Sequence, residues 1–111
     1  MSTAPQRYIK HVSELVNVAV DMRGLLDTSE LLTGTPTIVE VTTTDLTLSS
    51  KAINTGAVVV NGVSCAAGEA ITFRVAGGVA GTQYVIRITA GTNATPAQTR
   101  IVKVRLGVVA D

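Results

Sequence analysis

Aliphatic side chains recur at every second position along much of this chain, and this period limits what the chain can fold into. The alternation is clearest in residues 15–22, 70–76, 82–90 and 98–109. A period of two sends successive side chains to opposite faces of an extended strand, whereas an amphipathic helix needs a period near 3.6. The pattern therefore predicts strands with one buried and one exposed face.

β-branched residues supply most of the predicted buried faces. The chain has 17 Val, 16 Thr and 7 Ile among its 111 residues, but only three aromatic residues, Tyr8, Phe73 and Tyr84. Stiff β-branched side chains pack well on a pleated surface. We therefore expect a core of Val, Ile, Leu and Ala in which Phe73 and Tyr84 are the bulky structural members.

Turn-forming residues separate the alternating stretches. Asn61-Gly62 suits a type I′ hairpin turn, and the glycine-rich segment 77–81 predicts a flexible connection between strands. Residues 23–34 are interpreted as a connection, and no long helix is predicted. About seven short strands divided in this way are typical of an all-β, immunoglobulin-like antiparallel β-sandwich.

Gly81 in the predicted 77–81 turn and Tyr84 in the strand that follows are interpreted as structural residues. Tyr84 begins the penultimate strand, where a tyrosine hydroxyl can bond to the backbone of a loop in the arrangement called a tyrosine corner. The alternative is that its ring only packs in the core.

The chain is predicted to be one domain with an N-terminal arm. Residues 1–11 are mostly polar and do not alternate, so they are interpreted as an extended arm, and residues 12–111 as the sandwich domain. Apolar residues in the arm and at the end of the last strand are suited to hold a neighbouring subunit. The candidate partner contacts are Tyr8, Ile9, Lys10, Val108 and Val109.

The residue types that most active sites need are scarce. His11 and Cys65 are the single histidine and cysteine, so neither a zinc site nor a Cys–His pair is expected. The eight carboxylates form no calcium-loop motif. Segment 77–81 precedes an alternating strand rather than the helix that a phosphate-binding loop requires. We expect no catalytic residue, no metal site and no cofactor, and the chain is predicted not to be an enzyme.

The charge pattern gives little support for nucleic-acid or membrane partners. The formal net charge is +1, no apolar run approaches the length of a membrane span, and residues 1–10 hold no hydrophobic signal region. Nucleic-acid-binding sheets also use exposed aromatic rings, which are scarce here. The outward cations that might form a basic face are Arg74, Arg87, Arg100, Lys103 and Arg105.

The order of segments resembles a known family. The matching features are Lys10, residues 18–21, Leu25-Leu26, the Thr-rich residues 42–50, the run Gly77-Gly78-Val79-Ala80-Gly81-Thr82-Gln83-Tyr84, residues 86–91 and residues 101–104. They are similar to those of small structural proteins of tailed bacteriophages and prophages. Members are described as tail fibre adaptors or head–tail and neck accessory proteins with an immunoglobulin-like fold.

This resemblance implies a virion structural protein that is made in the host bacterial cytoplasm. Such a protein connects rings or fibres through its arm and strand edges, in repeated copies around a symmetric ring. Its implied partners are tail, neck or fibre subunits, and the family has no catalytic residues, so none is transferred to this chain.

Two alternatives remain open on the sequence. A capsid decoration or cement protein would belong to the same broad class and differ in its stoichiometry on the particle. A carbohydrate- or ligand-binding module belongs to another class. Sugar binding usually uses exposed aromatic rings, and three aromatic residues give it little support.

Overall fold

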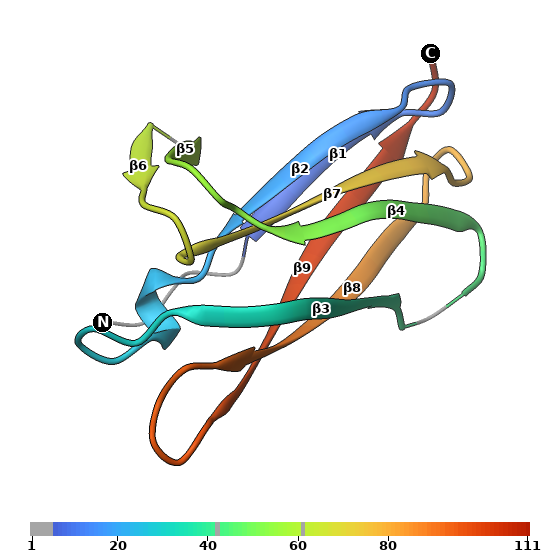
Figure 1. The fold of residues 1–111 in the computed structure, drawn as a ribbon. Helices are drawn as coiled ribbons and strands as arrows, with labels where there is room; N and C mark the ends of the chain where they lie inside the picture. The colour runs from blue at the N-terminus through green and yellow to red at the C-terminus, as the bar shows by residue number, and fades with distance from the viewer. Residues whose placement is uncertain (1–5, 42, 61) are drawn as a thin grey trace.

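The computed structural model describes residues 6–41, 43–60 and 62–111, and it confirms the all-β prediction. The start of the predicted arm, residues 1–5, and Asn61 of the predicted turn lie outside the described residues. The described part contains nine strands and one 3-10 turn: β1 (Gln6–His11), β2 (Val16–Asp21), η1 (Arg23–Leu25), β3 (Leu32–Glu40), β4 (Leu46–Ile53), β5 (Val58–Val60), β6 (Val63–Cys65), β7 (Ala70–Gly77), β8 (Gln83–Thr92) and β9 (Thr99–Val109). Figure 1 labels the strands.

The strands form two sheets that pack against each other and a small separate hairpin. One sheet has the order β1-β9-β8-β3 and the other the order β2-β7-β4, while β5 and β6, among the strands described, pair only with each other. The β5–β6 hairpin extends from one end of the sandwich (Figure 1). The sequence analysis predicted about seven strands, and β1, which it assigned to an arm, was not among them.

Residues 6–11 correct the prediction of an arm and of a purely antiparallel sandwich. They form β1, which pairs in parallel with β9 from Gln6 opposite Val104 to His11 opposite Val109. Pairing continues past the strand, because the Val12 N–H donates to the Val109 carbonyl at 3.0 Å. This segment is an edge strand because its backbone groups find partners along β9 and its alternate side chains turn toward the core.

The two inner faces meet in one aliphatic core, as the alternation predicts. Phe73 on β7 and Tyr84 on β8 are 1% and 0% exposed, and they lie among branched aliphatic side chains from both sheets. The predicted inward positions of residues 70–76, 82–90 and 98–109 that are fully buried are Ile71, Phe73, Val75, Tyr84, Ile86, Ile88, Val104 and Leu106. In residues 15–22, where the alternation predicts one buried side without saying which, Val18, Val20 and Met22 are fully buried.

Strand β3 begins earlier than the sequence pattern indicates. Leu32 pairs with Thr92 of β8, and a register shift between Thr33 and Thr37 interrupts the ladder before it resumes. Gly34 lies in this irregular region with φ of +76°, a conformation that glycine adopts without strain. The irregularity removes the period-two signal, so the segment was interpreted as part of a connection.

Truncation of Phe73 tests the assignment of the inner face. We expect Phe73→Ala to lower the free energy of unfolding by about 3–5 kcal/mol, because it leaves a cavity in a tightly packed core. Val59→Ala is the control, since Val59 is 69% exposed on the β5–β6 hairpin, and it should change stability by less than about 0.5 kcal/mol. Equal unfolding midpoints for the two variants in urea would contradict the assignment.

Candidate interaction surfaces

Tyr84 ties two loops together at one end of the sandwich. Its hydroxyl accepts a hydrogen bond from the Val79 backbone N–H at 2.7 Å and donates to the Asp45 carboxylate at 2.9 Å. The Gly81 N–H, in the same turn, donates to the Val108 carbonyl at 2.8 Å, and Gly81 has φ of +83°. The bond to a loop backbone that the sequence analysis considered is therefore present, together with burial of the ring.

Removal of the Tyr84 hydroxyl tests the contribution of these two hydrogen bonds to stability. We expect Tyr84→Phe to cost about 1–2 kcal/mol of unfolding free energy, because the Val79 N–H loses its acceptor. Val79→Ala is the matched control, since it removes a side chain that is 55% exposed and keeps the N–H. A Tyr84→Phe protein as stable as the wild type in chemical denaturation would show that only the ring matters.

Lys10 and Val108 were predicted to contact a partner, and both are buried instead. Their exposed fractions are 0% and 1%. The strand pattern of β1 turns Lys10 inward, and its ammonium donates to the backbone carbonyls of His11 and Val12 at 2.7 and 2.9 Å. A lysine can bury its aliphatic stem in this way while its charged end finds oxygen acceptors. These two residues support the sheet rather than a contact.

Tyr8 also has a role inside the molecule. Its hydroxyl donates to the Ala19 carbonyl of β2, so it links the edge of one sheet to the other sheet. Burial, with a further contribution from the Asp21 carboxylate, raises the pKa of Tyr8 to about 12. The side chain is only partly exposed, and it is not the open contact that the arm prediction implied.

Ile9 and Val109 are the predicted contacts that the fold leaves exposed, and it brings them together. Ile9 is 70% exposed and Val109 is 38% exposed. They lie on the outer side of neighbouring strands and line one shallow hollow of about 210 Å³ with Gly107, whose missing side chain opens the space, and with the turn at residues 81–83. We call Ile9, Val109 and this hollow the apolar patch.

Contacts at the ends of β1 and β9, and just beyond them, hold the two strands together next to this patch. The Ser13 N–H and hydroxyl both donate to the Asp111 carboxylate, and the His11 Nδ1 lies 3.2 Å from the Ala110 carbonyl oxygen. The hydrogen bonds from Ser13 hold the pKa of Asp111 below its usual value. His11 is exposed, and its contact with Ala110 joins the end of β1 to the segment after β9.

The cations predicted to face outward do not form one basic face, because they lie on different parts of the fold. Arg87 and Lys103 lie directly opposite each other on β8 and β9, and Arg105 follows on β9. Arg74 lies on β7, in the other sheet, where its Nε donates to the Asn17 side chain at 3.1 Å. Arg100 is engaged by carboxylates at the far end of β9. Only the first three can act as one charged surface.

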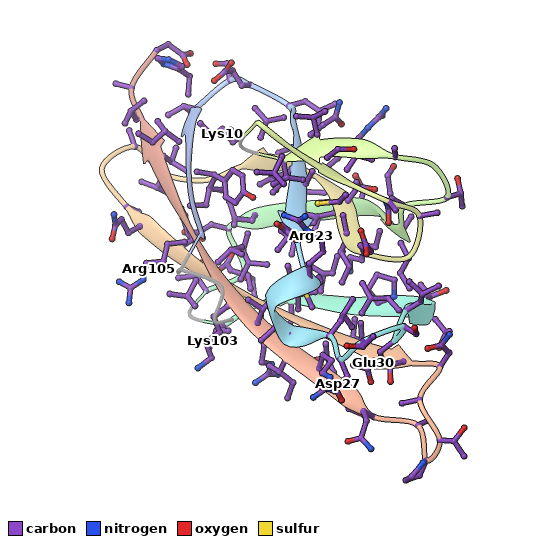
Figure 2. The ribbon with its side chains drawn as sticks, turned by 90° about the vertical axis from the view of Figure 1, so that its left-hand side faces the viewer. Lys10, Arg23, Asp27, Glu30, Lys103 and Arg105 are labelled. Carbon is purple, nitrogen blue, oxygen red and sulfur yellow. The ribbon has the colours of Figure 1, made fainter. Side chains whose placement is uncertain are left out.

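Sequence reasoning missed a buried ion pair between Glu30 and Arg100. The Glu30 carboxylate is 2% exposed and accepts hydrogen bonds from Arg100 Nη2 at 2.7 Å and from the Thr92 hydroxyl at 2.8 Å. Figure 2 shows Glu30 beside Asp27 at this end of the sandwich, and Asp27 accepts a second bond from Arg100 at 3.3 Å. The partners are 70 residues apart in sequence, so no local pattern reveals them.

The environment of Glu30 makes stability depend on pH. The Asp27 backbone N–H, with Thr92 and Arg100, holds the pKa of Glu30 below its usual 4.5, although burial acts in the opposite direction. Since the unfolded chain takes up this proton at a higher pH than the folded chain, the stabilisation is complete above about pH 4.5 and is lost as pH falls through the folded value.

Substitution of Glu30 tests this linkage. We expect Glu30→Gln to lower the melting temperature at neutral pH. Below about pH 4.5, the melting temperature of this variant should fall less steeply with pH than that of the wild type. Asp27→Asn is the control, because the Asp27 side chain is 84% exposed and this variant keeps the backbone N–H that bonds to Glu30. Parallel melting curves against pH for Glu30→Gln and the wild type would contradict the role of this carboxylate.

A groove of about 510 Å³ lies where β3 begins and β4 ends. Asn54 shapes its wall, since the side-chain amide bonds to the backbone of Gly56, Ala66, Gly68 and Ala70. Lys51 is the one ionisable residue in the lining, which otherwise consists of aliphatic, hydroxyl and amide groups. The groove has no pair of ionisable groups arranged for acid–base chemistry among the residues described.

Cys65 is buried at the base of the β5–β6 hairpin. Burial raises the pKa of its thiol, and the nearby Asp21 carboxylate acts in the same direction. Within the described residues, no three His, Cys, Asp or Glu side chains converge to hold a metal ion. The same residues include no helix long and apolar enough to cross a membrane.

Comparisons with protein-family models, with curated proteins and with solved structures find no match for this chain.

Proposed function

We propose that this chain is a structural subunit of a tailed-bacteriophage particle, an adaptor or accessory component at the neck or tail. The sequence resemblance to that family supports this proposal. The structural observation that carries it is the apolar patch, in which exposed Ile9 on the outermost strand β1 lies next to Val109 on the neighbouring strand β9. Burial of such aliphatic side chains by a neighbouring subunit removes apolar surface from water and therefore favours association.

The same proposal treats the sandwich as immunoglobulin-like. If β2, β7 and β4 are compared with strands B, E and D, and β3, β8 and β9 with C, F and G, the two sheets have the grouping of a constant-type immunoglobulin domain without its strand A. In that comparison β1 is an added strand beside G, and the β5–β6 hairpin is an insertion between D and E. This grouping supports the family resemblance.

The proposed mechanism is geometric. A rigid sandwich repeated around a symmetry axis presents the same patch at each position, so each copy can hold the next copy or a fibre subunit. β1 ends the strand order of its sheet, and in the described part no further strand lies beyond it. A segment of a neighbour could therefore extend the sheet there by β-augmentation.

Substitution in the apolar patch tests the proposal. We expect Ile9→Ser with Val109→Ser to reduce the incorporation of the chain into purified phage particles, measured by quantitative mass spectrometry, while its melting temperature changes little. Point changes are preferable to deletion of residues 1–10, because that deletion would remove most of β1.

Val59→Ser with Val63→Ser is the matched control, since these exposed valines lie on the β5–β6 hairpin. Unchanged incorporation of the patch variant, or absence of the wild-type chain from particles, would contradict the proposal. Counting copies by electron microscopy separates the alternatives, because a ring number indicates the neck or tail and a lattice number indicates capsid decoration.

A further inference from the structure

The outer face of the β1-β9-β8-β3 sheet carries cations and aliphatic side chains in a regular arrangement. Across β8 and β9, Arg87 lies opposite Lys103, Val85 opposite Arg105, and Thr89 opposite Ile101. The three cations are exposed, and Ile101 is 56% exposed. Figure 2 shows Lys103 and Arg105 pointing away from the body of the sandwich. We call Val85, Arg87, Ile101, Lys103 and Arg105 the basic face.

No carboxylate neutralises the basic face within the described residues. The ion pairs of the described residues join Arg23 to Asp21 and Arg100 to Asp27 and Glu30. None of them involves Arg87, Lys103 or Arg105. Like charges directly opposite each other in an antiparallel pair are destabilising. The Arg87–Lys103 pair therefore keeps an unfavourable repulsion that an anionic partner would relieve.

We propose that the basic face is a docking surface for an acidic protein surface, one that presents carboxylates beside aliphatic side chains. Carboxylates would neutralise Arg87, Lys103 and Arg105, and the aliphatic groups would cover Ile101 and Val85. This match of charge and apolar area gives specificity as well as attraction. The inference is separate from the proposed function, because it does not depend on which assembly contains the chain.

Two other occupants fit the basic face less well. Nucleic-acid-binding sheets stack bases on exposed aromatic rings, but Phe73 and Tyr84 are buried and the Tyr8 hydroxyl bonds to Ala19 of the other sheet. A second copy of the chain, docked face to face about a two-fold axis, would bring three cations against three more. Repulsion would then oppose the association.

Titration of the isolated full chain with short synthetic peptides tests the inference. The first peptide alternates glutamate and valine, and the second alternates lysine and valine. We expect the acidic peptide to shift backbone amide NMR signals of β8 and β9, with an affinity that falls as salt is added. The basic peptide should leave these signals in place. Shifts outside this face, or equal binding of both peptides, would overturn the inference.

Charge removal locates the interaction. Arg87→Gln with Lys103→Gln should weaken binding of the acidic peptide roughly tenfold. Lys51→Gln with Arg74→Gln removes the same charge from the other sheet and should leave the affinity within about twofold. Equal loss in both double variants would show attraction to net charge only and overturn the proposal. If a single-stranded oligonucleotide binds through Arg87 and Lys103 more tightly than the acidic peptide does, the partner is nucleic acid and the proposal of an acidic protein surface is overturned.

Reversal of the charge at Lys103 should change the melting temperature and the binding of the acidic peptide in opposite directions. Lys103→Glu places a carboxylate opposite Arg87, so we expect the melting temperature to rise by about a few degrees while binding of the acidic peptide is lost. A merely structural role for Lys103 predicts a fall in melting temperature. Unchanged peptide binding in this variant would also overturn the proposal.

Discussion

The structure depends on the burial of alternate aliphatic side chains between two twisted sheets. Strands β2, β7, β8 and β9 bury side chains at alternate residues, β1, β3 and β4 contribute fewer, and Phe73 and Tyr84 fill the space that Val and Ile leave. This burial supplies the main favourable free energy of folding. It also determines what remains outside, because every inward residue has a neighbour that must face solvent or a partner.

Polar interactions at the ends of the sandwich then define how the loops are held. Tyr84 joins the turn after β7 to the loop before β4, and Glu30 joins the connection before β3 to the start of β9 through Arg100. Asn54 performs the same task for the segment between β6 and β7. Each of these side chains also accepts a hydrogen bond from a backbone N–H of an irregular segment or its edge, at Val79, Asp27, Gly68 and Ala70, and so satisfies backbone groups that a sheet would otherwise pair.

Strand β9 connects the two candidate surfaces. Its outward positions run from Ile101 through Lys103 and Arg105 to Gly107 and Val109, so the basic face and the apolar patch follow each other along one strand. The parallel pairing with β1 adds Ile9 beside the apolar end. One face of this sheet therefore presents two surfaces of different chemistry in succession.

The sequence alone determined the all-β class, the inward side of β7, β8 and β9, and the burial of Phe73 and Tyr84, because period-two alternation is a local property of each strand. It did not reveal β1, whose pairing with β9 joins opposite ends of the chain, and so it assigned Lys10 to a contact surface. The Glu30–Arg100 pair and the opposition of Arg87 to Lys103 likewise depend on register between distant segments. Only the tertiary structure decides such features, since one sequence contains no direct record of which strands become neighbours.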